Sequence, residues 1–559
     1  MYLSSSRLRI FFILLLLALL GSCSKRLSGI SGLVIDEEGN PVIGAVVRIQ
    51  ATEVEILTDE DGNFKLTNLP PEKDFFVTAW SPGFFIVGAS AMPGDRVVEI
   101  ELHAHASEDN PDYVWLPSKY HPGQGENQGC AVCHSSAGTE DKTLLPVDEW
   151  LLDAHSQSAQ NPRFITMYNG TDVNGNQSPL TRYASNQDYG RFPLPPDLNK
   201  PYYGPGYKLD FPDSDGNCAA CHVPAASVND PYGIDPTKVT GVAAEGVPCD
   251  FCHKIWDVKL DPATQMPRLN MPGVLSYELR RPPKGNQFFA GPLDDVAPGE
   301  DTYLPLQQES AYCASCHHAI FWDTLIYNSY GEWLESAYSD PESGQTCQDC
   351  HMPTGLVDHF ALIEEAGLVR DPKTISSHKM LGAMDLAFMR DAITMTSSAD
   401  LTGDQILVRV EIFNDNTGHH IPTDNPMRHL ILVVEAEDSA GEPLELVDGP
   451  RLEDYAGIGN PQEGYYAGLP GMVYAKILED LWTENTPSGS YWNPTRLIID
   501  NRIPALETAS SDYAFSEPEG GEATITVRLI YRRAFIELMD QKGWNTPDIL
   551  VAEETINLK

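Results

Sequence analysis

The sequence predicts a multidomain protein in which two β-rich domains flank a central region of short helices and irregular chain. Residues 28–105 contain short segments of alternating hydrophobicity separated by turns, and residues 393–559 contain three long strand-like segments. Residues 106–392 show little periodicity but carry five copies of one cysteine motif. We therefore expect an N-terminal β-sandwich, a central domain built around the motifs, and a C-terminal β-sandwich-like domain.

The composition narrows the possible partners. Of 559 residues, 37 are basic and 80 are acidic, which gives a formal net charge of −43. Nucleic acid is excluded as a partner, because recognition of phosphate requires a basic surface. The acidic surface either attracts basic redox proteins or metal cations, or only keeps the protein in solution.

The N-terminus has the features of an export signal. Residues 1–22 contain a basic start, an apolar segment at 10–20 and small residues after it, and the apolar segment is too short to span a bilayer. The segment Leu20-Gly21-Ser22-Cys23 resembles the lipobox of bacterial lipoproteins. The resemblance implies that Cys23 is lipidated, that residues 23–27 are a short anchored linker, and that the protein is held in the cell envelope, at the outer membrane or on the periplasmic face. An ordinary signal peptide is the alternative.

Residues 28–105 are predicted to form strands at 30–36, 42–49, 75–80 and 97–102. The succession Gly32-Leu-Val-Ile-Asp36-Glu-Glu-Gly-Asn-Pro41, followed by Asp61-Gly62-Asn63-Phe64, resembles the carboxypeptidase regulatory-like (transthyretin-like) domain. The resemblance implies a β-sandwich that serves as a spacer or adhesion unit, without chemistry of its own. Asp59, Asp61 and Asn63 could belong to a calcium loop, but a strand follows and the distant Glu is missing, so we expect a hairpin turn.

The pattern Cys-x-x-Cys-His occurs five times in the central region. Its cysteines are Cys130, Cys133, Cys218, Cys221, Cys249, Cys252, Cys313, Cys316, Cys347 and Cys350, and its histidines are His134, His222, His253, His317 and His351. This spacing allows two thiols to form thioethers with one haem while the adjacent His binds its iron. One isolated copy could also belong to a zinc site or a redox dithiol. Ten of the 11 cysteines fall in the motifs and only Cys23 remains, so we expect five covalently attached haem c groups.

Haem groups also explain why residues 106–392 need so little regular structure. This region is rich in Pro, Gly, Asn and Tyr, and five large apolar macrocycles can serve as its core. The second and third motifs, and the fourth and fifth, are separated by short intervals, which suggests that these haems are neighbours.

The C-terminal region, residues 393–559, contains strand-like segments at 406–413, 429–436 and 524–531, and a predicted short helix at 534–542. It contains no Ser-His-Asp set, phosphate-binding loop or paired carboxylates, and we assign no catalytic residue.

The chain from Cys23 to Lys559 resembles bacterial multihaem (pentahaem) c-type cytochrome lipoproteins. In such proteins a second His completes each iron, and the resemblance implies distal ligands among the ten remaining histidines. His318 follows a motif directly, His155 lies in a segment predicted to be helical, and Gly418-His419-His420-Ile-Pro-Thr423 matches a Gly-His-x-x-Pro-Thr loop. The complete set of candidates is His155, His318, His359, His378 and His419, with His121 in reserve.

Methionine is the alternative distal ligand. Met352 follows a motif directly, and Met380, Met384 and Met389 have helical spacing, which more often marks packing than ligation. His429 lies on a predicted strand, where we expect packing or solvation.

The resemblance implies electron transfer between a periplasmic or membrane donor and an outer acceptor, rather than catalysis. Two alternatives stay open: a multihaem reductase of nitrite, hydroxylamine or sulfur oxyanions with one open haem, and a subunit of a cytochrome filament. The Cys-x-x-Cys-Lys motif of pentahaem nitrite reductases is absent from the sequence.

Overall fold

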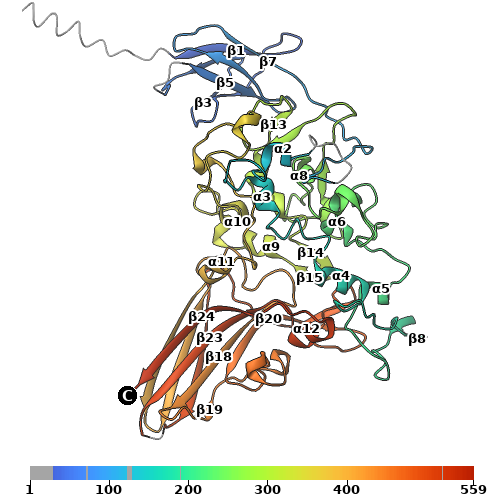
Figure 1. The fold of residues 1–559 in the computed structure, drawn as a ribbon, viewed down its shortest axis with the longest axis vertical. Coiled ribbons are helices and arrows are strands. Elements are labelled where there is room, and N and C mark those ends of the chain that lie inside the picture. The colour runs from blue at the N-terminus through green and yellow to red at the C-terminus, as the bar shows by residue number, and fades with distance from the viewer. Residues whose placement is uncertain (1–28, 71–73, 122–128, 189, 519) are drawn as a thin grey trace, which may run out of the picture. The chain divides into compact units, whose positions relative to one another are not determined.

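The computed structural model describes residues 29–70, 74–121, 129–188, 190–518 and 520–559 (Figure 1). The chain divides into two compact units. The first contains the described residues up to Tyr113, with Arg280–Pro305 and Leu368–Asp371, and the second contains Val114–Leu279, Leu306–Gly367 and Pro372–Lys559. Cys23 and the predicted signal peptide lie outside the described residues. No helix in the described part of the chain is long and apolar enough to cross a membrane.

The first unit contains a two-sheet β-sandwich, as the sequence predicts. One sheet has the order β4-β1-β7 and the other β3-β2-β5-β6. The strands are β1 (Ile30–Asp36), β2 (Val46–Ile49), β3 (Glu55–Leu57), β4 (Asn63–Leu66), β5 (Phe75–Trp80), β6 (Val87–Ala91) and β7 (Val98–Leu102). Alternation along β7 buries Val98, Ile100 and Leu102 and exposes the glutamates between them. Apolar side chains from both sheets thus form one core.

The turn before β4 differs from the expected hairpin. The Asp59 carboxylate accepts hydrogen bonds from the backbone N–H groups of Asp61 and Asn63, at 3.0 and 2.8 Å. However, β3 pairs with β2, whereas β4 pairs with β1. The turn therefore carries the chain from one sheet of the sandwich to the other, because the strands before and after it pair in different sheets.

A segment from the middle of the sequence also belongs to the first unit. Residues 280–305 contain β12 (Phe289–Gly291) and β13 (Asp301–Tyr303), which pair in parallel. The buried Asp294 carboxylate accepts hydrogen bonds from Thr78 Oγ1 on β5 at 3.0 Å and from Arg370 at 2.8 Å. Trp80 Nε1 donates to Thr302 Oγ1 at 3.1 Å. This unit is therefore built from three separate stretches of sequence.

The cysteine motifs lie in a part of the second unit that is made of single helical turns and two-stranded ladders. The longest of its helices, α4 (Pro162–Asn169), is capped by the Asn161 side chain and ends at Gly170, whose φ of 70° is left-handed. The other elements are α2 (Ala131–His134), α3 (Pro146–Trp150), β8 (Tyr183–Asn186), β9 (Gly190–Pro193), α5 (Tyr207–Asp210), α6 (Ala219–His222), α7 (Pro224–Ser227), α8 (Cys249–Cys252), β10 (Ile255–Val258), β11 (Tyr277–Leu279), β14 (Ala319–Phe321), β15 (Thr324–Tyr327), α9 (Ser329–Leu334), α10 (Cys347–His351) and α11 (Leu386–Asp391).

The helix predicted around His155 does not form, because α3 ends at Trp150 and turns follow it. The Asp153 side chain accepts a hydrogen bond from the backbone N–H of His155 at 2.7 Å. Asp commonly competes with helix formation in this way.

The C-terminal part of the second unit is a larger sandwich of two sheets, with the orders β16-β17-β22-β19 and β21-β20-β18-β23-β24 (Figure 1). The strands are β16 (Thr394–Thr402), β17 (Gln405–Phe413), β18 (His429–Asp438), β19 (Leu446–Asp448), β20 (Gly471–Asp480), β21 (Thr495–Asp500), β22 (Thr508–Ser516), β23 (Ala523–Arg532) and β24 (Ile549–Leu558). Val408 of β17 and Leu432 of β18 belong to one buried core that lies between the sheets.

The opposite face of the five-stranded sheet packs against helices. Ile431 and Ile530 share a second cluster with Met167 of α4 and Leu538 of α12 (Ile536–Lys542). Helix α12 ends at the left-handed Gly543, as its sequence predicts. The fully buried Lys542 donates from Nζ to the carbonyls of Thr166, Thr171 and Pro205, at 3.1, 3.1 and 2.5 Å. The motif-bearing region and the C-terminal sandwich are thus joined in one packed unit.

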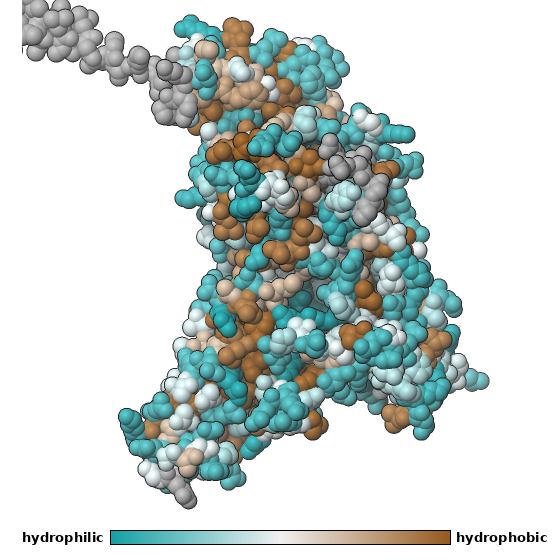
Figure 2. Space-filling view, viewed as in Figure 1, coloured by the Kyte–Doolittle hydropathy of each residue, from teal (hydrophilic) through white to brown (hydrophobic). Residues whose placement is uncertain are grey.

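Hydrophilic residues predominate on the face of the C-terminal sheets shown in Figure 2. This agrees with the excess of acidic over basic residues in the sequence.

Candidate functional site

Each cysteine motif occupies a single helical turn. The first, second, third and fifth motifs lie at α2, α6, α8 and α10. The fourth motif begins at Cys313, the last residue of a 3-10 turn at Ser310–Cys313. The backbone N–H of the motif His donates to the carbonyl of the first Cys in four motifs, for example from His134 to Cys130 at 2.9 Å and from His317 to Cys313 at 3.2 Å. One turn of helix brings residues i, i+3 and i+4 to the same side. The two thiols and the imidazole of one motif can therefore all reach the same bound group.

Hydrogen bonds and packing place the motifs beside one another. The backbone N–H of Cys347 in the fifth motif donates to Ser310 Oγ, three residues before the fourth motif, at 2.9 Å. The fourth and fifth motifs are therefore adjacent, as their short interval suggests. Ser118 contacts the first and third motifs, because its carbonyl accepts from the backbone N–H of Ala131 at 3.2 Å and its Oγ from that of Cys249 at 3.1 Å. The second and third motifs share an apolar cluster that contains Ala220 and Phe251, and Cys316 of the fourth packs against it.

Three motif histidines each face a histidine from a distant part of the chain. The ring centroids of His155 and His317 are 6.3 Å apart, those of His253 and His378 are 6.5 Å apart, and those of His351 and His419 are 6.2 Å apart. Two imidazoles that bind one metal, each through a nitrogen about 2 Å from it, have ring centroids about 6 Å apart. Their spacing therefore fits a shared iron in all three pairs.

Hydrogen bonds at Nδ1 orient the rings of two of these pairs. His317 Nδ1 donates to the Asp424 carboxylate at 3.0 Å, and His155 Nδ1 donates to the Asp153 carboxylate at 2.6 Å. His351 and His419 donate instead to the backbone carbonyls of Leu381 and His420, at 2.5 and 2.9 Å. A bond at Nδ1 fixes the tautomer and leaves Nε2 for a metal. Among the described residues, none accepts from or donates to Nε2 of these four histidines.

The loop between β17 and β18 supplies two of these groups. It carries His419, which faces His351, and Asp424, which accepts from His317 and from the backbone N–H of Ser329 at 3.1 Å. Asp424 has a left-handed φ of 59°, a conformation that Asp and Asn tolerate better than most residues. The C-terminal sandwich thus completes the surroundings of two motifs.

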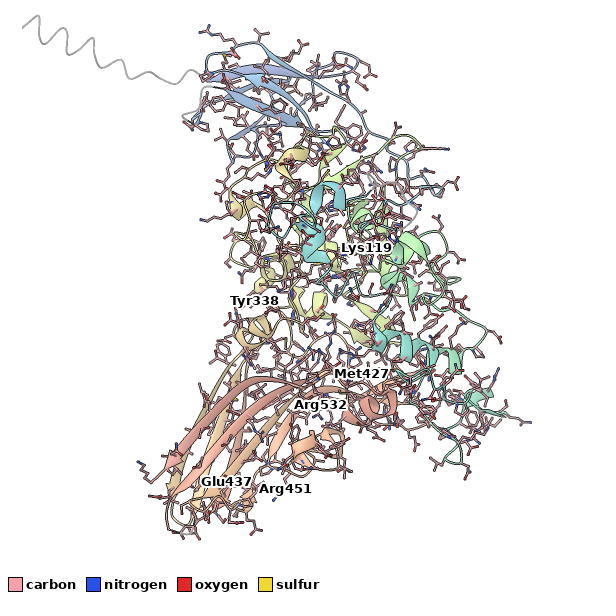
Figure 3. The ribbon with its side chains drawn as sticks, in the orientation of Figure 1. Lys119, Tyr338, Met427, Glu437, Arg451 and Arg532 are labelled. Atoms are coloured by element: carbon pink, nitrogen blue, oxygen red, sulfur yellow. The ribbon has the colours of Figure 1, made fainter. Side chains whose placement is uncertain are left out.

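Buried charges hold this loop in place. Glu332 of α9 accepts from the backbone N–H of His420 at 3.2 Å and from Thr423 Oγ1 at 2.6 Å. Arg502 donates to the other Glu332 oxygen at 2.7 Å, and both side chains are at most 5% exposed. Tyr338, labelled in Figure 3, donates its hydroxyl to the carbonyl of Asp415 at 3.1 Å.

The His378 segment is fixed by another carboxylate. Glu149 of α3 accepts from the backbone N–H of His378 at 2.7 Å and from Ser377 Oγ at 2.9 Å. Burial is the main cause that raises the pKa of Glu149 and lowers the pKa of His378 to about 4. His378 is thereby held as a neutral imidazole, the form that binds metals.

The motif histidines differ in their electrostatic surroundings. Burial lowers the pKa of His222 and of His351 to about 4. Burial also opposes protonation of His317, but the hydrogen bond and charge of Asp424 outweigh it and raise the pKa of His317 to about 9. For Asp424, burial acts against ionisation, and the stronger opposing effects of His317 and Arg428 leave the pKa of the carboxyl well below its ordinary value.

The other candidate histidines have different partners. His318 is buried and its Nδ1 donates to Asn328 Oδ1 at 2.9 Å. Both ring nitrogens of His359 are hydrogen-bonded to carboxylates, Nδ1 to Asp358 and Nε2 to Asp141, each at 2.7 Å. His121 Nε2 bonds Glu245 at 2.5 Å. The Nε2 atoms of His359 and His121 are therefore both occupied by hydrogen bonds to carboxylates and are not available to a metal in this arrangement.

Two motif histidines, His134 and His222, lie outside the three pairs. His134 Nδ1 donates to the carbonyl of Phe360 at 2.9 Å, whereas His222 has a different partner. Its Nδ1 donates to the carbonyl of Ser158 at 3.2 Å, and its ring stacks on Phe164 with centroids 3.6 Å apart. Within the described parts of the chain, no second histidine ring faces His222.

His429 is fully buried on β18 and stacks on Phe535, in agreement with a packing role.

The donor set fits haem c better than zinc. In the residues that the structure describes, no group of three or more His, Cys, Asp or Glu side chains converges on one point, as a zinc tetrahedron of thiolates would require. The arrangement instead consists of opposed imidazole pairs beside paired thiols, which suits an iron whose remaining ligands come from a porphyrin. Met389, a possible alternative ligand, is packed in the core of the C-terminal sandwich, and Met384 is 67% exposed.

Sequence reasoning named the histidines but missed the carboxylates. Asp424 contacts His317 only through the tertiary fold, whereas the contact of Asp153 with His155 is local. The one available signal is position, since Asp424 directly follows the Gly-His-x-x-Pro-Thr loop and Asp153 lies two residues before His155.

Comparison with known proteins gives two results that bear on this chain. Residues 29–95 match the carboxypeptidase regulatory-like domain family, which agrees with the sandwich of the first unit. A penta-heme cytochrome c552 from Thermochromatium tepidum has a similar fold, with a TM-score of 0.50 and 20% sequence identity over 77% of this chain and 97% of the other. A cohesin-X-dockerin complex from Acetivibrio cellulolyticus matches over 14% of this chain and 51% of the other, with 16% identity and a TM-score of 0.10, which carries no weight. No curated protein sequence matches the chain. The chain therefore contains a carboxypeptidase regulatory-like domain, and over most of its length its fold is similar to that of a pentahaem cytochrome.

Proposed function

We propose that the protein is a multihaem c-type cytochrome that relays electrons through five covalently attached haem c groups, from a periplasmic or membrane donor to an outer acceptor. The observation that carries the proposal is the set of three opposed histidine pairs, each with the spacing of two ligands to one iron. Haem c supplies a one-electron iron couple when bound. The ten motif cysteines would hold the groups by thioether bonds, and the five motif histidines would bind the irons.

The distal ligands follow from the pairing. His155 would serve the fourth motif, His378 the third and His419 the fifth. His318, whose Nδ1 is fixed by Asn328, is our candidate for one of the two remaining irons. His359 stays a candidate for the other, with His121 in reserve, although either would first have to release its carboxylate.

The haem content tests this proposal directly. The exported wild-type protein should gain the mass of five haem groups and show a c-type reduced-minus-oxidised spectrum. The double variant Cys249→Ser/Cys252→Ser should gain four. Colourless wild-type protein without added mass would refute the assignment.

A reductase is the second candidate function, and the surroundings of His222 favour it. No second histidine faces this ring among the described residues, so a haem on the second motif could have an open side. Adding nitrite, hydroxylamine or a sulfur oxyanion to the oxidised protein should then shift a high-spin signal. If none of the three ligands changes the spectrum, the reductase is refuted and electron transfer is the remaining proposal.

We further propose that Cys23 is lipidated and holds the protein in the cell envelope. The support comes from the lipobox-like sequence before it. Cys23→Ala should move the protein from the membrane fraction to the soluble fraction with its haem content unchanged.

The net charge of −43 favours a basic redox protein as partner, and the association of the two proteins should weaken as salt increases.

A further inference from the structure

The paired histidines of the fourth and fifth motifs differ in what accepts their Nδ1 hydrogen bonds. Around the fourth motif both acceptors are carboxylates, Asp424 for His317 and Asp153 for His155. Around the fifth motif both acceptors are backbone carbonyls, those of Leu381 and His420. The two motifs are adjacent, since the backbone N–H of Cys347 donates to Ser310 Oγ, three residues before the fourth motif, at 2.9 Å.

Both carboxylates are held away from solvent. The Asp153 side chain is 3% exposed and the Asp424 side chain 14% exposed. Asp153 also accepts the backbone N–H of His155 at 2.7 Å, and Asp424 accepts that of Ser329 at 3.1 Å. Each carboxylate is therefore fixed by a second hydrogen bond, and its charge is only weakly screened by water.

A carboxylate on Nδ1 makes an imidazole a more basic ligand than a neutral carbonyl does. A more electron-donating ligand and a nearby negative charge both stabilise ferric iron relative to ferrous iron. Both effects lower the reduction potential of the haem that the ligand serves. The fourth motif has two such contacts, and the paired ligands of the fifth motif have none.

We propose that Asp153 and Asp424 are potential-setting residues, which make the haem of the fourth motif the lower-potential member of the adjacent fourth and fifth pair. This inference rests on the proposed function, because it requires haem c at both motifs. Electrons would accordingly pass from the fourth motif to the fifth. Arg428 partly offsets the charge of Asp424, whereas Asp153 makes no ion pair other than its contact with His155 among the described residues.

The test replaces each aspartate by asparagine, which keeps an oxygen acceptor but removes the charge. Asn also tolerates the left-handed backbone at position 424. In a spectroelectrochemical titration of the full-length haem-loaded protein, Asp424→Asn and Asp153→Asn should each shift one haem toward the ferrous form by about tenfold at fixed potential, or about 59 mV for one electron. Asp512→Asn, a substitution of the same charge at a 70% exposed site, should shift none.

Electron paramagnetic resonance separates charge from orientation. Every haem that is low-spin in the wild type should stay low-spin in both variants, with altered g values for the affected one. Conversion of that haem to high spin would mean that the carboxylates only orient the rings, and unchanged potentials would also overturn the inference. If Asp424→Asn does not fold, Asp153→Asn alone decides, because it acts on the opposite ligand. A wild-type protein without haem would instead refute the proposed function.

Discussion

His351 and His419 face each other with ring centroids 6.2 Å apart and ring planes inclined by 14°, although one lies on helix α10 and the other on a loop of the C-terminal sandwich. A centroid spacing of about 6 Å is what two imidazoles bound to one metal would have. The pair therefore joins the motif-bearing region to the C-terminal sandwich, and under the proposed function both rings would bind one iron.

Removal of the distal imidazole tests this pairing. His419→Ala should convert one low-spin haem to high-spin while all five thioether-bound haems are retained, and added imidazole should restore the low-spin spectrum. His420→Ala is the matched control. Its side chain lies on the same loop, but the nearest acidic group, Glu332, is 3.8 Å from its Nδ1, and no histidine ring faces it among the described residues. A spectral change in His420→Ala alone would reverse the assignment.

Glu332 should act on the same centre through the loop. Glu332→Ala leaves Arg502 with only Asp500 as an acidic partner and removes the acceptor of Thr423. Loss of one member of a buried ion pair costs about 3–5 kcal/mol of unfolding free energy. We expect that loss in denaturant unfolding, together with a partial high-spin signal that imidazole abolishes. A destabilised protein with a fully low-spin spectrum would show that the loop does not depend on Glu332.

His318 provides a test of the remaining ligands. His318→Ala should convert one further haem to high-spin without loss of covalent haem, because Asn328 holds the imidazole in a fixed orientation. Asn328→Ala removes only the orienting bond and should broaden the low-spin signal. Absorption and electron paramagnetic resonance spectra identical to wild type in His318→Ala would show that it binds no iron.

The first unit should depend on Asp294, whose carboxylate pairs with the buried Arg370. Asp294→Ala leaves this guanidinium without one partner and should lower the stability of the unit by about 3–5 kcal/mol. Glu37→Ala, at an exposed pair with His103, should leave the unfolding transition unchanged. Limited proteolysis at increasing urea concentration measures the stability of both variants. Equal stabilities of the two variants would contradict the prediction.

Lys542 predicts a pH dependence of stability. Burial lowers its pKa from the ordinary 10.5 to about 7. Between pH 7 and 10.5 the unfolded chain therefore binds a proton at this site that the folded chain does not, and stability rises with pH. Urea unfolding at pH 7, 8 and 9 should show a steeper rise in the wild type than in Lys542→Met. Equal slopes would mean that the three surrounding carbonyls keep the ammonium charged.

Much of the sandwich architecture could be predicted from sequence, because alternation of apolar and polar residues is a local signal. The segments at 30–36 and 75–80 coincide with β1 and β5, and those at 406–413 and 524–531 lie within β17 and β23. The pairing of strands, in contrast, depends on residues that are far apart in the sequence. The Asp59 turn has the chemistry of a hairpin, yet it connects two sheets, and nothing near residue 294 indicates that it belongs with β5.

The motif cysteines and histidines could be proposed as haem ligands from sequence because their spacing is itself the chemical requirement, and this assignment stays a prediction. The identity of each opposed pair could not, since His155 lies before the second motif yet faces the histidine of the fourth. The contact of Asp424 with His317 was also beyond sequence, because 107 residues separate them. The contact of Asp153 with His155 is local, and their spacing was an available signal.

The loop that carries His419 and Asp424 has a consequence for biosynthesis. All five attachment motifs leave the ribosome and the export channel before this loop does. Under the proposed function, haem can therefore become attached to a chain whose fourth and fifth motifs still lack His419 and Asp424. A chain truncated before residue 414 should then be fully coloured yet incompletely coordinated at these two motifs, so haem attachment alone would not report that the C-terminal sandwich has folded.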